Sequence, residues 1–211
     1  MTLSPLDMLL MNYAAGSLAP QESLLVAAHI TLNAEARRKV SRYEAMGGRL
    51  MCEAEPAEVR SGCLDATLSR IDGTVPAARQ QRPARDTASD LHIPEAVYAL
   101  ISGFCLSDRR SWSSVTRGFS KMDLRLCPLP TQKRLRLVKM DPRASAPRHS
   151  HPGTEVTVVL QGSFTDQTGQ YRKGDIVIIS DPRLIHQPVA SEEGCGCLTL
   201  TEAPLRFQDP F

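Results

Sequence analysis

The stretch from His149 to Gly162 constrains the fold and chemistry of this chain more than any other part of the sequence. Its pattern is H-x-H-x3-E-x6-G, with His149, His151 and Glu155 at positions i, i+2 and i+6. Side chains alternate between the two faces of a strand, so these three residues point to the same side. Two imidazoles and one carboxylate are typical ligands of zinc, iron, manganese or nickel. The pattern therefore predicts a site for one divalent metal on a sheet.

A fourth ligand is needed to complete such a site, and His186 is the candidate. It follows the turn signal Gly174-Asp175 and the strand-like run 176–179. The chain has only 5 histidines in 211 residues, and three of them are used in this set. Polar residues of an exposed loop are the alternative interpretation, but the combined spacing favours a metal site.

Charge and composition exclude several classes of protein. Basic and acidic residues are balanced, at 25 and 23, so the composition carries no footprint of direct nucleic-acid binding. No apolar run is long enough to span a bilayer. The segment from Met1 to Pro20 contains no Lys or Arg, whereas a secretory signal has a basic first region. We therefore expect a cytoplasmic protein that contacts neither nucleic acid nor membrane directly.

The 6 cysteines predict no disulfide framework. Cys195 and Cys197 form a C-x-C pattern on a predicted strand, so they share a face, which we expect to point to the interior. Packing as small apolar residues is the favoured interpretation, and a redox role stays open although no basic neighbour activates a thiolate. The other four stand singly along the chain: Cys52, Cys63, Cys105 and Cys127.

The first part of the chain has helical periodicity. Gly16 and the pair Gly47-Gly48 are predicted to end two of its helices, and Pro20 to begin another. A bundle of such short helices has little spare core and often relies on a metal or a partner. The predicted helices cover residues 5–15, 20–32, 34–46 and 58–71.

The second part of the chain has the pattern of a β protein. Residues 76–90 contain almost no large apolar side chain and are predicted to form a flexible linker. A short helix is predicted from Pro94, and short strands separated by Gly and Pro follow Trp112. That rhythm indicates an all-β sandwich or barrel. We expect a helical domain at 1–75 and a β domain at 91–211.

The metal pattern resembles the two motifs of the cupins, which are small jelly-roll barrels. The first motif is matched at His149, His151, Glu155 and Gly162, and the second at Gly174 and His186. The expected fold is therefore an α+β multidomain chain with an N-terminal helical bundle and a C-terminal all-β cupin jelly-roll barrel. The sequence departs from the cupin pattern at three positions: Arg143 and Ser180 replace a glycine and a proline, and Ala190 replaces an asparagine.

The order of a short helical domain and a cupin resembles the ChrR-type anti-sigma factors. These bacterial regulators hold an extracytoplasmic-function sigma factor inactive and release it under oxidative stress. The likeness is carried by three stretches: 7–18 with its Tyr-Ala-Ala-Gly-Ser-Leu end, 27–39, and the cupin motif with the terminal string Ala203 to Phe207.

This resemblance implies a function for each half of the chain. The helices are expected to bind a sigma factor, and the cupin to sense stress or a ligand through one metal, with zinc the first choice. Cupins commonly dimerise, so a homodimer is a further expectation. Candidate contacts to sigma are Leu9, Leu10, Leu24 and Leu25, for which the alternative is bundle core.

One departure from this family concerns a second metal site. Its helical domain usually holds zinc with an H-x3-C-x2-C signature and an upstream histidine. Here His29 is present, but the two cysteine positions fall at Asn33 and Ala36, and the upstream position falls near Ser4. A single histidine cannot close a tetrahedral site, so we predict no zinc in this domain. His29 is then expected at the surface or near a helix cap, and Asn33 at an N-cap.

An enzyme is the rival hypothesis. A cupin with three His and one Glu ligand can also activate dioxygen or polarise a carbonyl, as metal-dependent dioxygenases and isomerases do. No separate acid or base beside the motif demands chemistry, which favours the regulator. A third hypothesis is a regulator that no longer binds sigma, because its N-terminal zinc ligands are missing.

Overall fold

A computed structural model describes residues 3–73, 95–104, 112–124 and 133–208. The predicted linker, Cys105 and Cys127 lie outside these residues. The helices are α1 (Pro5–Ala14), α2 (Pro20–Leu32), α3 (Ala34–Glu53), α4 (Cys63–Asp72) and α5 (Glu95–Phe104). The strands are β1 (Ser113–Thr116), β2 (Phe119–Leu124), β3 (Arg134–Met140), β4 (His149–Ser150), β5 (Glu155–Asp166), β6 (Gly169–Arg172), β7 (Ile176–Ile179), β8 (Val189–Thr201) and β9 (Arg206–Phe207).

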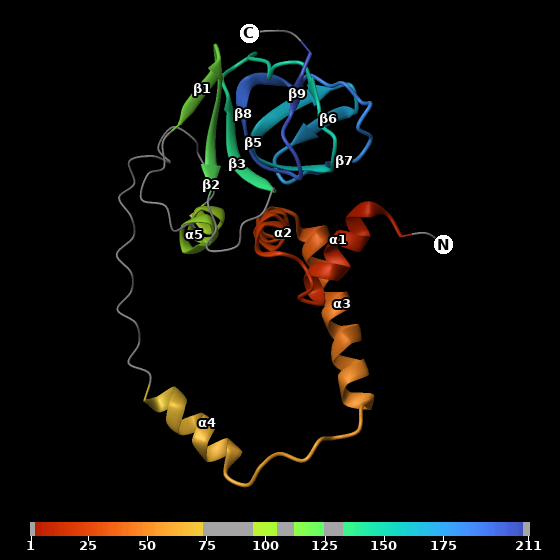
Figure 1. The fold of residues 1–211 in the computed structure, drawn as a ribbon, viewed down its shortest axis with the longest axis vertical. Coiled ribbons are helices and arrows are strands. Elements are labelled where there is room, and N and C mark those ends of the chain that lie inside the picture. The colour runs from red at the N-terminus through yellow and green to blue at the C-terminus, as the bar shows by residue number, and fades with distance from the viewer. Residues whose placement is uncertain (1–2, 74–94, 105–111, 125–132, 209–211) are drawn as a thin grey trace.

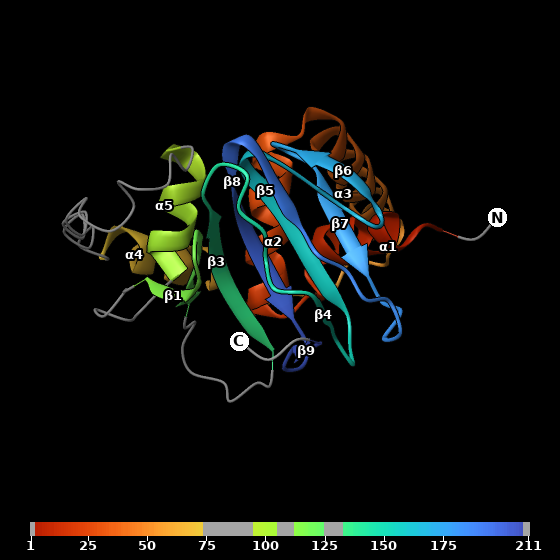
Figure 2. The ribbon, with the colours of Figure 1, turned by 90° about the horizontal axis from the view of Figure 1, so that it is seen from above.

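The strands curl into an antiparallel barrel above the helices, as Figure 1 shows. Seven of them form one sheet in the order β1-β2-β3-β8-β5-β6, with β7 also paired to β5. The short strands β4 and β9 pair separately. The long strands β5 and β8 run side by side through the middle of the sheet in Figure 2. This architecture confirms the predicted helical part followed by an all-β cupin barrel.

Two residues with left-handed backbone explain local features of the cupin pattern. Gly162 has φ 63°, and a Cβ at this position would overlap the carbonyl oxygen of Gly194 in the neighbouring strand. Only glycine fits there. Arg143 has φ 61°, a conformation that non-glycine residues seldom adopt. The glycine usual at this position of the cupin pattern would take that conformation without strain.

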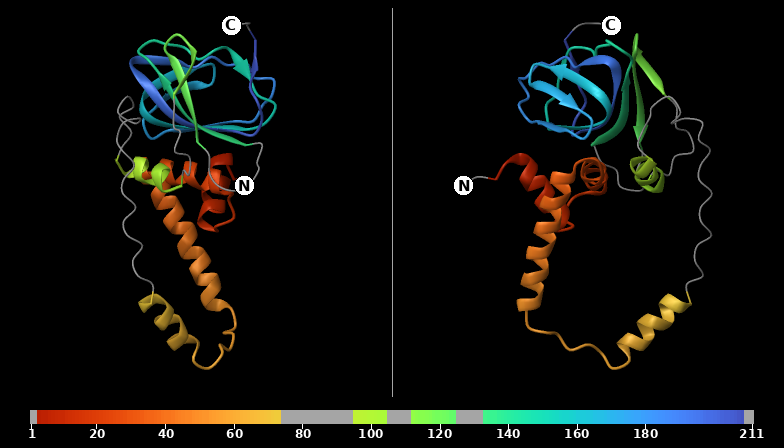
Figure 3. Two further views of the ribbon diagram at one scale, coloured as in Figure 1. Left: turned by 60° about the vertical axis from the view of Figure 1, so that its left-hand side comes forward. Right: turned by 180° about the vertical axis from the view of Figure 1, so that it is seen from behind.

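Helix α2 packs directly on the barrel. Its residues Leu24, Leu25 and Ala28 are at most 1% exposed and share one core cluster with Val97 of α5 and Leu198 of β8. Figure 3 shows α2 and α5 lying against the same side of the barrel in both views. The helical half and the β half are therefore joined by a common hydrophobic core.

A smaller cluster holds the helices to one another. Leu10 of α1, Val26 of α2, and Ala36 and Val40 of α3 are all at most 5% exposed, with partly buried Leu9 packed against them. Leu10, Leu24 and Leu25 therefore have the core role that was the alternative to sigma contact.

Two predicted helix boundaries were wrong. Helix α3 continues through Gly47 and Gly48 to Glu53, because neither glycine adopts the left-handed conformation that ends a helix. Helix α4 begins at Cys63 rather than near residue 58, because Gly62 has φ 77° and breaks the helical path before it. Within the described residues, no helix combines the length and hydrophobicity needed to cross a membrane.

Candidate metal centre

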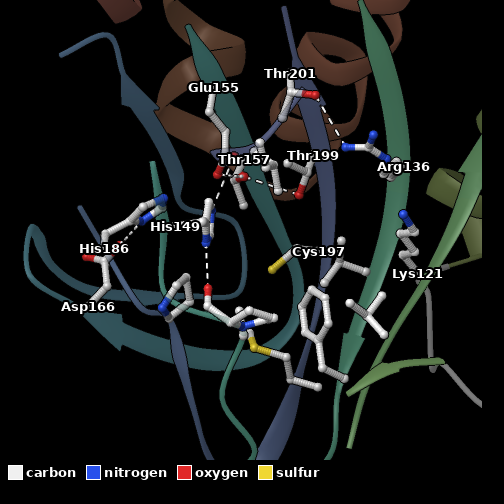
Figure 4. A pocket seen from close by; sticks show the side chains of 18 of the residues that line it. Lys121, Arg136, His149, Glu155, Thr157, Asp166, His186, Cys197, Thr199 and Thr201 are labelled. Carbon is white, nitrogen blue, oxygen red and sulfur yellow. Dashed lines mark hydrogen bonds and ion pairs between the residues drawn. The ribbon is translucent and has the colours of Figure 1, made fainter. Parts of the chain in front are cut away.

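The structure brings His149, Glu155 and His186 together at one end of the barrel cavity, as Figure 4 shows. One potential ligand atom from each lies within 4.8 Å of the others, and all three residues are buried. His149 lies on β4 and Glu155 begins β5. The backbones of His149 and His186 pair through two hydrogen bonds, of 3.1 and 2.9 Å, which fixes the position of the distant histidine.

His151 lies beside this group of three rather than within it. Its ring centroid is 5.3 Å from that of His186 and 6.1 Å from that of His149. The residue is 1% exposed, so its ring faces the protein interior. The fourth predicted ligand is therefore next to the cluster, and its metal binding stays a prediction.

Hydrogen bonds fix the orientation of all three imidazoles. The Nδ1 atoms of His149 and His151 lie 2.7 and 3.0 Å from the carbonyl oxygens of Pro147 and Gly153. A carbonyl oxygen only accepts, so Nδ1 carries the proton in each ring. His186 Nδ1 likewise lies 2.9 Å from a carboxylate oxygen of Asp166. In the neutral rings, every Nε2 is left with a lone pair.

Two of these Nε2 atoms are buried without a hydrogen-bond partner among the described residues, in His151 and His186. Buried polar atoms in folded proteins are nearly always paired, so an orphaned lone pair calls for an explanation. A metal ion held by the three grouped residues would satisfy the Nε2 atom of His186. The donor set of imidazole nitrogens and one carboxylate also suits a divalent transition metal.

The electrostatics of the cluster favour the neutral form of His149. Burial lowers the pKa of His149, although the nearby Glu155 acts in the opposite direction. His149 Nε2 lies 4.0 Å from the Glu155 carboxylate. That carboxylate also accepts a hydrogen bond of 3.3 Å from the hydroxyl of Thr157. The neutral ring that burial favours at His149 is also the form that can bind a metal.

A cavity of about 240 Å³ opens beside the cluster inside the barrel (Figure 4). One wall is polar: the hydroxyl oxygens of Thr157 and Thr199 lie 3.2 Å apart, and Arg136 donates to Thr201 over 3.3 Å. The opposite wall is apolar and includes Phe119, Val138, Met140, Phe164 and Val177. The cavity is large enough for a small organic molecule next to the three grouped residues.

Cys195 and Cys197 share a face of β8, as predicted. Both are buried, and their sulfur atoms lie 3.5 Å apart. Cys197 also lines the cavity. The hydrogen bond with Cys195 and burial raise the pKa of the Cys197 thiol well above its usual value. A protonated buried thiol is a poor nucleophile, which agrees with the packing interpretation.

Asp166 is the residue of this site that the sequence did not reveal. It ends β5 at a tight turn, Asp166-Gln167-Thr168-Gly169, and such residues are expected in any hairpin. The threonines that line the polar wall were missed for a similar reason, because alternating Thr residues are common in strands. In the sequence alone, neither Asp166 nor these threonines can be distinguished from ordinary turn and strand residues.

His29 lies near a helix cap, which was one of its two expected places, but it is not at the surface. It lies in the last turn of α2 but is 2% exposed, because the ring packs between the helices and the β6–β7 turn. Its Nδ1 donates to the carbonyl oxygen of Gly174 over 3.0 Å. The expectation of a surface residue was wrong, because the ring is held in the interior by its hydrogen bond to Gly174, 145 residues away in the sequence.

The three positions that replace zinc ligands have structural roles. Ser4 caps α1, with its hydroxyl accepting from the amide of Asp7. Asn33 caps α3, where its side chain accepts from two backbone amides and also donates weakly to Gly174, over 3.4 Å. Ala36 is buried in the helical core. The predicted N-cap at Asn33 is confirmed.

The chain is similar to proteins of one family along almost all of its length. Residues 103–204 match the model of the ChrR cupin-like domain. The chain is 39% identical, over 205 residues, to the anti-sigma-E factor ChrR of Cereibacter sphaeroides, which covers 95% of this chain and 90% of that relative. It also matches the crystal structure of Rhodobacter sphaeroides SigE in complex with the anti-sigma factor ChrR. That match has a TM-score of 0.71 and 33% identity, and it covers 94% of this chain and 97% of the other.

Proposed function

Because this chain belongs to the ChrR family of cupin-containing anti-sigma factors, we propose that it binds an extracytoplasmic-function sigma factor through its N-terminal helices. The cupin would act as the sensing module for stress or a ligand. The observation that carries this proposal is the likeness to a ChrR chain held in complex with SigE, which extends over both the helices and the barrel.

The surface that suits a protein partner is the arm, which we define as residues 46–72, from the end of α3 through α4. Figures 1 and 3 show it extending away from the barrel. No residue of α4 is buried, and Leu50 and Leu64 are 69% and 70% exposed. Further exposed apolar residues of the arm are Met46, Met51, Val59, Leu68 and Ile71. Such a concentration of exposed apolar side chains is typical of an interaction site.

The arm replaces the contacts that the sequence suggested. Leu10, Leu24 and Leu25 are at most 1% exposed and cannot reach a partner without unfolding the core. Leu64 and Leu68, by contrast, are four residues apart and lie on the same face of α4. An amphipathic helix of this kind packs its apolar face into a groove of a partner.

This proposal is tested by placing charge on the arm. A variant with Leu64→Asp and Leu68→Asp should lose sigma binding by at least ~100-fold, because each buried leucine contributes about 1.5–3 kcal/mol. The measurement is titration calorimetry of the full chain with the purified extracytoplasmic-function sigma factor from the same organism.

Ser69→Asp provides the control, since it adds one of these two negative charges to α4 at a position about 100° around the helix from Leu68. It should bind within about threefold of the unchanged chain, well under 1 kcal/mol. Equal binding by the unchanged chain and the double variant would remove the arm from the interface. Binding of no sigma factor by the unchanged chain would favour the hypothesis of a regulator that has lost its partner.

We also propose that His149, His151, Glu155 and His186 hold one divalent metal, with zinc the first choice. The orphaned Nε2 atoms of His151 and His186 support this assignment. Three neutral imidazoles and a carboxylate match the ligand preferences of zinc, while iron, manganese and nickel accept the same donors. When bound, the metal would cross-link the start of β5 to the segment that carries His186. Residues 149–186 would then keep a single arrangement that a reactive species or ligand can disturb.

Metal analysis of two histidine variants tests this assignment. His149→Ala should lose the metal, because it removes a ligand at the centre of the cluster. His29→Ala should retain it, because His29 binds Gly174 and belongs to a different contact. The metal content of both purified proteins is measured by mass spectrometry after dialysis. Loss of metal from both variants, or from neither, would contradict the assignment.

The division into domains remains a proposal with boundaries at 1–75, 76–90 and 91–211. Helix α2 and the barrel share one hydrophobic core. If a partner is released by movement of one domain against the other, Leu24 and Leu25 must therefore separate from the barrel. Two arrangements with different affinity for sigma are the minimum that such a switch needs.

The cavity favours a second candidate function, a metal-dependent cupin enzyme. A space of about 240 Å³ beside the grouped residues, with one polar and one apolar wall, suits an organic substrate as well as a sensed ligand. An oxygenase would show substrate-dependent oxygen uptake by the iron-loaded chain. A regulator would instead change its sigma affinity without turnover, so measuring both on one preparation separates the two functions.

A further inference from the structure

Asp166 is a buried carboxylate that belongs to neither of the two sequence motifs. It lies at the end of β5, and its side chain is 1% exposed. Figure 4 shows it beside His186 at the edge of the cavity, which both residues line. Burial of an ionised group is costly unless hydrogen bonds compensate, so its position requires specific partners.

Both oxygens of Asp166 have such partners. One accepts a hydrogen bond of 2.9 Å from His186 Nδ1, and the other accepts from the backbone amide and the hydroxyl of Thr168. The next residue, Gln167, accepts from the backbone amide of Gln187 over 2.8 Å. The β5–β6 turn therefore binds both the ring of His186 and the backbone amide of the next residue, Gln187.

His186 differs in this respect from the other two histidines of the site. His149 and His151 donate to backbone carbonyls, whereas His186 donates to a full negative charge. A charged acceptor makes a stronger hydrogen bond than a neutral one and increases electron density on the ring. The same bond directs Nε2 of His186, which is orphaned among the described residues, toward the cluster.

We infer that Asp166 is a positioning residue that fixes His186 as the strongest imidazole donor of the proposed metal site. The inference rests on that proposed site, and Asp166 acts through His186 without touching the metal. Removal of such an outer partner typically weakens metal binding by about 10–100-fold.

The test compares Asp166→Asn with Asp181→Asn in the full chain. Asp181 is also a carboxylate near His186 in sequence, but it is exposed and pairs with Arg183. Zinc affinity is measured by competition with a chromophoric chelator, and the melting temperature of each metal-free protein is recorded beside it. We expect about 10–100-fold weaker binding for Asp166→Asn and no change for Asp181→Asn.

A double variant separates positioning from general electrostatics. In a His186→Ala background, Asp166→Asn should change zinc affinity by no more than about threefold, because the ring through which it acts is gone. An undiminished effect in that background would overturn the inference. Unchanged affinity of the Asp166→Asn single variant would overturn it while leaving the metal site intact. Absence of zinc binding by the unchanged chain would refute both.

A measurement on the unchanged chain covers the case in which Asp166→Asn does not fold. Nitrogen-15 NMR of the histidine rings should show His186 protonated at Nδ1 and coordinating zinc through Nε2. Coordination of zinc through Nδ1 would contradict the role of Asp166.

Discussion

Apolar side chains are buried in the barrel and its docked helices, but they are exposed in the arm. In the barrel, Val158, Leu160 and Leu198 are 0% exposed, and α2 adds its own leucines to the same core. In the arm, Leu50 and Leu64 are about 70% exposed. Burial of apolar area is the main force that stabilises a fold. The first region therefore supplies its own stability, while the apolar surface of the arm is suited to burial against a partner.

The largest expected effect is on stability and distinguishes the two regions directly. Leu24→Ala should reduce the free energy of unfolding by about 2–5 kcal/mol, because it leaves a cavity between α2 and the barrel. Leu68→Ala in the arm should change it by less than about 0.5 kcal/mol. Urea denaturation of both variants provides the measurement. Similar losses would mean that the arm packs as tightly as the barrel.

Thiol labelling is expected to show the next largest contrast. Cys52 and Cys63 are exposed in the arm, whereas Cys195 and Cys197 are buried in the barrel. The raised pKa of Cys197 also keeps its thiol protonated. Alkylation with iodoacetamide, followed by peptide mass spectrometry, should proceed on the order of 100-fold faster for the first pair. Comparable rates would show that the barrel opens readily.

A smaller effect is expected at Asn33, where the helix that leads into the arm begins. Asn33→Ala should cost about 1 kcal/mol of stability, because two backbone amides of α3 lose their acceptor. Asn33→Asp keeps that acceptor and should cost less than half as much. Equal costs in thermal melts would assign the role of Asn33 to its contact with Gly174 rather than to the cap.

The smallest expected effect is a pH dependence within the first region, where the docked helices meet the barrel. Burial lowers the pKa of His29 below its usual value of 6.5, so the unfolded chain takes up the proton first as pH falls. The stability contribution is therefore complete above pH 6.5 and is lost on acidification below it.

His29→Asn is the matched variant, because it retains a donor near Gly174 but does not titrate. With chelator present, its unfolding free energy should fall less steeply below pH 6.5 than that of the unchanged chain. The lowered pKa of His149 acts in the same direction, so some dependence persists in the variant. Identical slopes for both proteins would show that His29 is accessible to protons.

The parts of the fold that followed from the sequence were those with a strong local period. The strand at 176–179 and the helix from Pro20 were predicted at their observed positions, and α5 within one residue of its start. The spacing of H-x-H-x3-E, combined with His186, also predicted three residues that the structure brings within 4.8 Å. The premise of a single strand was wrong, because His149 lies on β4 and Glu155 begins β5, with residues 151–154 outside any strand. The tertiary fold, and not alternation along one strand, brings these side chains together.

The parts that did not follow were decided by contacts between distant residues. His29 was expected at the surface or near a helix cap. It lies in the last turn of α2, but its ring is buried and donates to Gly174 in the other half of the chain. Asp166 had the appearance of an ordinary turn residue until His186 was placed beside it. The length of α3 depended on whether two glycines would leave the helical conformation, and sequence permits either outcome.

The segment 166–175 has fixed points at both ends. At one end Asp166 holds the ring of His186, and at the other the carbonyl of Gly174 receives His29 and Asn33 from the helices. Surface loops usually tolerate inserted or deleted residues. A change in the length of this segment would displace either Asp166 from His186 or Gly174 from His29 and Asn33. Relatives that keep both contacts should therefore vary in the residues of this segment but not in its number of residues.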